Sequence, residues 1–190
     1  MVTQYLIFFL LLSSYTLTSV STEETGFVRS LDREMMGMEK KKNFSQFRFY
    51  WQDIVVGNNV TSVAIVPPLP KYNPVNAFGL VRIFDNALTL GPELSSKLVG
   101  RAEGFYASTS PTQLDFLVVM SFALFEGRYN GSSITIAGRD VVSNTVREMP
   151  VIGGSGVFRF STGYAEARTH FFDPKTDNAV LEFNVYVFHY

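Results

Sequence analysis

The amino-acid sequence predicts an all-β fold, an antiparallel barrel or sandwich, and two observations carry this prediction. Aromatic residues make up 15% of the 190 residues, with 18 Phe and 9 Tyr, and such side chains suit a pleated, half-buried surface. From Phe44 onward, short β-rich runs alternate with Gly, Pro, Asn and Asp, which is typical of barrels and sandwiches. The length allows one domain with a sizeable core.

Nine runs are predicted to be strands, and no run of adequate length has helical periodicity. They cover residues 46–56, 60–66, 79–86, 97–108, 113–126, 133–138, 145–151, 157–172 and 179–189.

The N-terminal region has the pattern of a secretory signal peptide in residues 1–21. Its apolar stretch, Tyr5 to Leu12, is too short to span a bilayer, and Ser19-Val20-Ser21 offers a small-residue cleavage site. Residues 22–43 are polar and are expected to form a solvated arm before the β domain at 44–190. We therefore expect a secreted, extracellular protein with no membrane anchor.

Composition argues against several functions. The net charge of −1 gives no basic field for nucleic acid. With no Cys, the fold depends on its core alone, and His170 and His189 offer no metal-ligand spacing. The run Gly153 to Gly156 lacks the Lys and the following helix of a phosphate loop. We expect no metal and no cofactor.

Three asparagines stand two residues before Ser or Thr and are candidate glycan acceptors. They are Asn43, Asn59 and Asn130. In a secreted chain such sites belong on the surface.

The run LVGRAEGFYAS (98–108) places Gly100, Ala102, Gly104 and Tyr106 on one face. Glycine weakens a strand, so two on one face need a reason. Room for a ligand below the Tyr106 hydroxyl and tight packing between strands both fit, and this run alone does not decide between them.

The run at 113–126 is apolar on both faces, whereas a strand with one solvated face alternates. Because no helix remains to cover the second face, we expect a subunit interface there, including Leu117 or Val119.

Acidic side chains occupy strand positions where they need explanation. In FRFYWQDIVV, Asp53 shares a face with Phe47, Phe49 and Trp51. Desolvation there would raise its pKa and make it a general acid, although a rim Asp bonded to a turn also fits. Asp85 raises the same question in RIFDNALTL, but Asp85-Asn86 also fits a turn.

Several blocks resemble the signature segments of plant dirigent proteins. They are FRFYWQDI (47–54), GRAEGFY (100–106), FEGRYNGSSITIAGRD (125–140) and REMPVIGGSGVFRFSTGYA (147–165), in order within Phe44 to Tyr190. The resemblance implies an eight-stranded antiparallel β-barrel with a central cavity, similar to allene oxide cyclase. It also implies a homotrimer that is secreted to the apoplast.

The resemblance implies a function as well. A separate laccase or peroxidase makes phenoxy radicals from a monolignol such as coniferyl alcohol, and the barrel orients them so that coupling gives one lignan stereoisomer. Matched by motif, the catalytic positions are Asp53, Tyr106, Asp140 and Arg147. The expected substrate-binding positions are Phe49, Trp51, Asp85, Gly104 and Arg139.

Two other functions fit the same resemblance. The blocks FRFYWQDIV, ELSSKLVGRA and NVYVFHY are similar to the legume branch that includes pterocarpan synthase, which dehydrates an isoflavanol through a quinone methide. The third function is a defence or cell-wall protein that binds a phenolic without turning it over. Glu103, Asp140 and Thr162 depart from the common family pattern, so substrate, stereochemistry and enzymatic status stay open.

Overall fold

The computed structural model describes residue 29 and residues 31–190. The chain divides into two units, Met1–Glu39 and Lys40–Tyr190. The expected signal peptide lies outside the described residues. In the described part of the first unit, turns occupy residues 33–39, and Arg33 Nε lies 3.2 Å from Glu39 Oε1 in an exposed ion pair.

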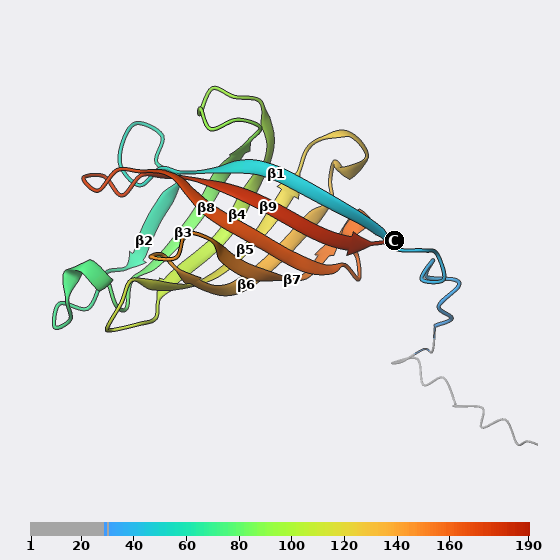
Figure 1. The fold of residues 1–190 in the computed structure, drawn as a ribbon, viewed down its shortest axis with the longest axis horizontal. Coiled ribbons are helices and arrows are strands. Elements are labelled where there is room, and N and C mark those ends of the chain that lie inside the picture. The colour runs from blue at the N-terminus through green and yellow to red at the C-terminus, as the bar shows by residue number, and fades with distance from the viewer. Residues whose placement is uncertain (1–28, 30) are drawn as a thin grey trace, which may run out of the picture. The chain divides into compact units, whose positions relative to one another are not determined.

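The second unit is an all-β closed barrel of eight antiparallel strands, as predicted (Figure 1). Around the barrel the order is β1-β9-β8-β7-β6-β5-β4-β3, and β3 pairs back to β1. The strands are β1 (Asn43–Asp53), β2 (Ser62–Val66), β3 (Val81–Thr89), β4 (Leu98–Ser108), β5 (Asp115–Leu124), β6 (Ser133–Val141), β7 (Arg147–Ser155), β8 (Thr162–Phe172) and β9 (Ala179–His189). Three short 3₁₀ turns are η1 (Pro74–Asn76), η2 (Gly127–Tyr129) and η3 (Gly156–Phe158).

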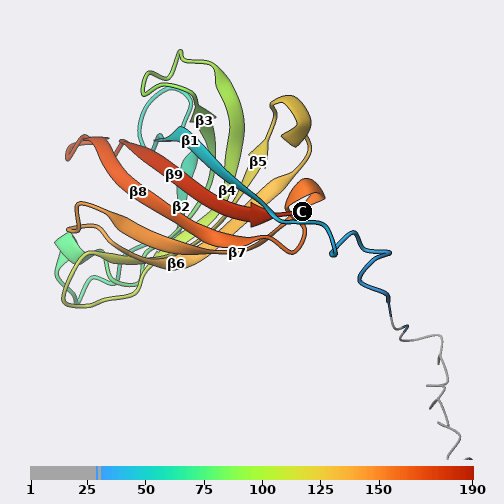
Figure 2. The ribbon, with the colours of Figure 1, turned by 45° about the vertical axis from the view of Figure 1, so that its right-hand side comes forward.

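Nine strands make an eight-stranded barrel because β1 and β2 share one edge of β3. The C-terminal part of β1 pairs with the C-terminal half of β3, from Tyr50↔Thr89 to Gln52↔Ala87. The short β2 continues along the N-terminal half, where Ser62 pairs with Phe84. On its other side, β1 pairs with β9 along its whole length, and the two run side by side with β8 in Figure 2. The segment between β1 and β2 therefore lies where the barrel closes.

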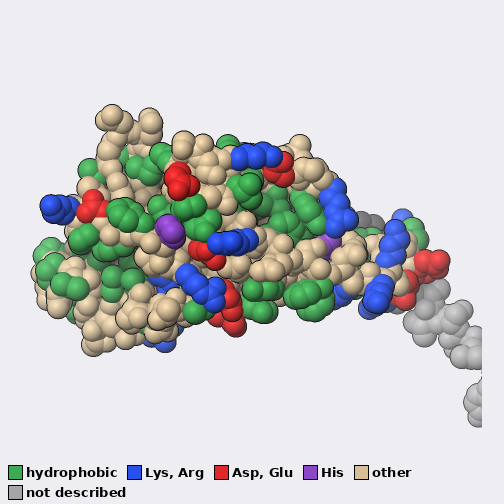
Figure 3. Space-filling model, turned by 45° about the horizontal axis from the view of Figure 1, so that its top comes forward, with side chains coloured by type: hydrophobic (Ala, Val, Ile, Leu, Met, Phe, Trp, Pro, Cys, Tyr) green, Lys and Arg blue, Asp and Glu red, His purple; other side chains and the backbone are tan. Residues whose placement is uncertain are grey.

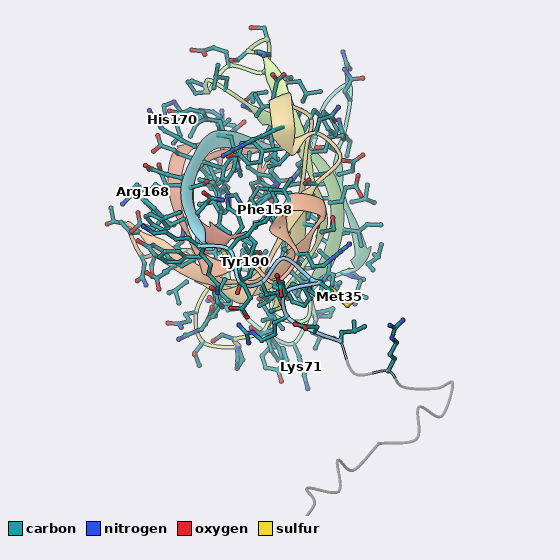
Figure 4. The ribbon with its side chains drawn as sticks, turned by 90° about the vertical axis from the view of Figure 1, so that its right-hand side faces the viewer. Met35, Lys71, Phe158, Arg168, His170 and Tyr190 are labelled. Carbon is teal, nitrogen blue, oxygen red and sulfur yellow. The ribbon has the colours of Figure 1, made fainter. Side chains whose placement is uncertain are left out.

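The barrel interior is filled by alternate side chains of every strand. Near its middle three buried rings pack together. The centroids of Phe49 and Phe122 lie 4.9 Å apart, and those of Phe122 and Phe183 lie 5.4 Å apart. Figure 4 shows Phe158 of η3 inside the ring of strands, whereas Arg168 and His170 of β8 lie outside it.

The orientation of β5 answers a question that the sequence left open. Val118, Met120 and Phe122 belong to the buried core, so their face points inward. Leu117 points outward and is 45% exposed, and Val119 is on the same outer face.

An outward apolar stripe crosses neighbouring strands. Its residues pair in sequence across the sheet, as Val63↔Ile83, Ile83↔Phe105 and Phe105↔Val119. Ile83 is 47% exposed and Phe105 is 39% exposed. Another view of the barrel surface, Figure 3, likewise shows hydrophobic side chains among sparse charges, as expected for a chain with 17% charged residues.

The glycines of β4 pack closely against β5. A Cβ at Gly100 would overlap the Ala123 carbonyl oxygen, and one at Gly104 would overlap the Val119 carbonyl oxygen. The structure therefore explains both glycines by tight packing between strands.

Candidate functional site

A carboxyl group at the C-terminal end of β1 is the centre of the candidate site. Asp53 follows Phe49 and Trp51 on the inward face, as the alternation predicts, and it is 5% exposed. Asn86 Nδ2 donates to its Oδ1 at 3.1 Å, and the Tyr106 hydroxyl donates to its Oδ2 at 3.3 Å. Residues from β1, β3 and β4 thus converge on one carboxyl group.

Burial sets the protonation behaviour of this group. Desolvation raises the pKa of Asp53, and it outweighs the opposing effects of Asn86, Ser62, Arg82 and Tyr106. The pKa of Tyr106 is also raised, first by burial and then by the nearby charge of Asp53. Tyr106 therefore stays a hydrogen-bond donor, while Asp53 retains its proton to higher pH than an exposed Asp does.

A second pair of functional side chains comes from β6 and β7. Arg147 Nε lies 3.4 Å from Asp140 Oδ1, and both residues are buried. The pKa of Asp140 is raised, chiefly by burial, although the Arg147 guanidinium opposes the rise. An acid and a fixed cation therefore face the interior side by side.

Phe116 connects the two groups through contacts. It is the cross-strand partner of Asp140, and its ring lies 4.9 Å from that of Tyr106 between centroids. The four predicted catalytic residues thus form two pairs, Asp53 with Tyr106 and Asp140 with Arg147, with an aromatic ring between the pairs.

Two inward residues of β3 were not predicted from the sequence. Arg82 and Asn86 share a face with the buried Phe84 and Leu88, so they point toward the interior. Arg82 contributes positive charge near Asp53, which opposes its pKa rise. The alternation Arg82, Phe84, Asn86, Leu88 was the signal that could have found them.

Asp85 and Arg139 were expected to bind substrate, and that expectation is wrong on their orientation. Asp85 alternates with Phe84 and Asn86, so it points outward, where its side chain is 56% exposed and pairs with Arg101. Arg139 alternates with Asp140 and pairs with Asp115 on the outer side at 2.6 Å. Adjacent strand positions face opposite sides of a sheet, and the next residue, Asn86 or Asp140, occupies the inner side.

Several buried polar atoms have no hydrogen-bond partner among the described residues. They include Trp51 Nε1, Ser62 Oγ, Arg82 Nε, Asp140 Oδ1 and two nitrogens of Arg147. Buried polar groups are normally paired. Of these residues, Asp140 and Arg147 still pair by charge, and Ser62 still lowers the pKa of Asp53.

A separate cavity of about 310 Å³ lies toward the other end of β1. It is bounded by Phe47, Phe49, Leu124 and Tyr129, with Lys97 at its edge. Along β1, Asp53 lies six positions after Phe47 and four after Phe49, about 20 Å and about 13 Å at the rise of an extended chain. This cavity is distinct from the site around Asp53.

The three candidate glycan acceptors, Asn43, Asn59 and Asn130, are exposed, as expected for such sites. Within residues 31–190 and residue 29, His, Asp and Glu side chains form no cluster of three that suits a metal ion. Over the same residues, no helix has the length and apolar character needed to cross a bilayer.

Comparison with known proteins identifies the family. The family model for Dirigent-like proteins matches residues 44–188. Dirigent protein 7 of Arabidopsis thaliana is 48% identical over 164 residues, which cover 86% of each chain. Pterocarpan synthase 1 of Glycyrrhiza echinata is 38% identical over 183 residues, 96% of this chain and 93% of that protein.

A solved structure agrees with the sequence matches. The pterocarpan synthase dirigent protein PsPTS1 is 41% identical to this chain and superposes with a TM-score of 0.75. The match covers 80% of this chain and 98% of that one. By fold and site, the protein is an eight-stranded antiparallel β-barrel with buried acidic side chains facing its interior. The chain belongs to the dirigent family.

Proposed function

We propose that this protein binds phenoxy radicals of a monolignol of the coniferyl alcohol type and directs their coupling to one lignan stereoisomer. A separate laccase or peroxidase supplies the one-electron oxidation. The observation that carries this proposal is the buried carboxyl of Asp53, whose pKa is raised by burial and which lies beside Tyr106 and Trp51 in an aromatic interior.

The reaction then needs orientation of the radicals and proton transfer at each ring closure. Two bound radicals form a carbon–carbon bond without any gain or loss of electrons by the protein, and the face that each presents decides the stereoisomer. Each quinone methide half of the coupled product closes when the hydroxyl of the other half attacks its methide carbon. The quinone oxygen gains a proton, and the attacking hydroxyl releases one.

Side chains of the site match these two proton positions. Burial favours a proton on Asp53, which suits donation to the quinone oxygen. Asp140 beside Arg147 suits acceptance of the proton that the hydroxyl releases, because the adjacent guanidinium stabilises the carboxylate. General acid–base assistance of this kind typically contributes about 10²–10⁴-fold to a rate.

A second candidate is dehydration of an isoflavanol through a quinone methide. The similarity to pterocarpan synthases along nearly the whole chain favours it. An acid protonates the leaving hydroxyl, water departs, and a phenolic hydroxyl adds to the methide and releases a proton. The same acid and base serve this reaction, and no oxidant is needed.

One paired assay tests both candidates. Chiral chromatography follows coniferyl alcohol with a one-electron oxidant, with and without the protein, and an isoflavanol without oxidant. Enantiomeric excess in the first arm supports lignan coupling, and product in the second supports the dehydratase. Binding of a phenolic with racemic coupling and no dehydration would contradict both candidates and leave a binding protein.

The assembly and location complete the proposal. We propose that subunits associate through the stripe formed by Val63, Ile83, Phe105 and Val119, as a homotrimer. An exposed stripe of this kind is costly to leave in water. We further propose secretion to the apoplast, where glycans at Asn43, Asn59 or Asn130 face solvent.

A further inference from the structure

Three hydrogen bonds run from the β1–β2 segment to the carboxyl group of Asp53. The backbone N–H of Ile54 donates to Thr61 Oγ1 at 3.3 Å. The Thr61 hydroxyl donates to Asn86 Oδ1 at 2.5 Å. Asn86 Nδ2 donates to Asp53 Oδ1 at 3.1 Å.

The three bonds run in one consistent direction from the backbone to Asp53. A backbone N–H can only donate, so Thr61 Oγ1 must accept from Ile54. The same hydroxyl keeps its own proton for donation, and it donates to the oxygen of the Asn86 amide. The amide nitrogen of Asn86 consequently faces Asp53, where it can only donate.

Backbone hydrogen bonds hold Thr61 in place on both sides. Its backbone N–H donates to the Ile54 carbonyl at 2.9 Å, and its carbonyl accepts from the Asp85 N–H at 3.0 Å. Both ends of the residue are thus tied, one to the end of β1 and the other to β3. Asn86 itself is fully buried, so no water replaces its partners freely.

We propose that Thr61 is a positioning residue: by orienting the Asn86 amide as a donor, it sets the proton affinity of Asp53. A donor opposite Asp53 favours the carboxylate, whereas an amide turned by half a rotation would present an oxygen and favour the protonated acid. The other titratable or charged groups facing Asp53 are Tyr106 on β4 and Arg82 on β3. The hydroxyls of Thr61 and Ser62 are the polar groups from the β2 side.

Thr61 is also the third residue of the sequon Asn59-Val60-Thr61. The hydroxyl that a glycosylating enzyme requires in the unfolded chain is therefore bound in the folded chain to a residue of the site. A substitution of Thr61 removes both roles at once, so variants must separate them. Asn59→Gln removes the sequon and keeps the hydroxyl, and Thr61→Ser keeps both.

The inference rests on the proposed function only for its effect on catalysis, and its test needs no substrate. The full chain is labelled with ¹³C at the Asp carboxyl carbons, and the Asp53 signal is assigned by its loss in Asp53→Asn. The midpoint of its titration is compared among the parent, Thr61→Val, Thr61→Ser and Asn59→Gln. We expect a higher midpoint in Thr61→Val and parental midpoints in the other two variants.

A measurement on the parent protein covers the case in which Thr61→Val does not fold. The side-chain amide ¹⁵N signal of Asn86 should shift with pH at the same midpoint as the Asp53 carboxyl, because the two atoms share a hydrogen bond. An Asn86 signal that ignores the Asp53 titration would overturn the proposal. An unchanged midpoint in a folded Thr61→Val, or an equal shift in Asn59→Gln, would overturn it as well. None of these results depends on whether the protein acts on lignan precursors or isoflavanols.

Discussion

Asp140 on β6 and Arg147 on β7 form an ion pair inside the barrel, with Oδ1 and Nε 3.4 Å apart. Their side chains are 10% and 3% exposed, so neither charge is well solvated. Removing one partner of a buried pair leaves the other charge uncompensated. The pair therefore affects stability as well as chemistry.

We expect Arg147→Met to lower the free energy of unfolding by about 3–5 kcal/mol, because it leaves Asp140 buried without its cation. Urea denaturation followed by circular dichroism measures this change. The double variant Asp140→Leu with Arg147→Met removes both charges and should recover much of the loss. If the double variant is less stable than Arg147→Met alone, the pair does not act as described.

Asp53→Asn and Asp140→Asn should each abolish stereocontrol or turnover, with a rate loss of about 10²-fold or more, because Asn cannot transfer the proton. Asn keeps an oxygen as hydrogen-bond acceptor, so the barrel should still fold. Asp85→Asn is the matched control, since that carboxylate lies outside the barrel. Chiral chromatography of the product gives the readout, and full enantiomeric excess in both inner variants would refute the acid–base assignment.

The stability of the barrel should depend on pH through Asp53. Its pKa is raised by burial, so between the unfolded and folded pKa values the folded state binds more protons and stability falls as pH rises. Asp53→Asn carries no charge at any pH. Its Tm should therefore exceed that of the parent at neutral pH by about 2–4 °C, the effect of about 1 kcal/mol in a domain of this size.

Differential scanning calorimetry from acid to neutral pH checks this prediction. Below the unfolded pKa of Asp the carboxyl is protonated in both states, so the difference in Tm between variant and parent should shrink there. A difference that is constant across this range would show that Asp53 does not titrate differently in the folded and unfolded states.

A charge placed in the outward stripe should disrupt association. Ile83→Glu and Phe105→Glu each put a carboxylate where an apolar side chain is 47% or 39% exposed in the single chain. We expect monomers or aggregates from these variants and a trimer from the parent, measured by light scattering. Ile152→Glu, an exposed change on β7, is the control and should keep the parental mass. A monomeric parent protein would rule out the proposed interface.

Alternation along single strands was the most productive signal in the sequence. In β1 the inward set of Phe47, Phe49, Trp51 and Asp53 was predicted correctly, because three aromatics of one parity mark the core side. In β3 the same argument failed. Its outward residues Val81 and Ile83 are apolar, and Ile83 belongs to the exposed stripe. Apolar residues at these positions suggested that this face points inward, which gave the wrong orientation for Asp85.

Contacts between strands were beyond the reach of such patterns. The proximity of Asp140 and Arg147 depends on the register of β6 and β7, which shifts at a bulge between Thr135 and Ile136. A slip of one residue moves every side chain to the opposite face, and although Gly153 beside the bulge is a typical bulge residue, it does not give the register by itself. The resemblance to dirigent proteins supplied the two residues, and the structure shows that they pair.

One face of β5 packs in the barrel interior and the other lies on the outer surface, and this separation has an evolutionary consequence. Val118 and Met120 contribute to the interior, whereas Leu117 and Val119 belong to the outer surface. Because neighbouring positions are independent in this way, substitutions that reshape the interior for a new phenolic leave the outer surface intact, and the reverse also holds. A lineage of such barrels can therefore diversify its chemistry while every member inherits the same surface.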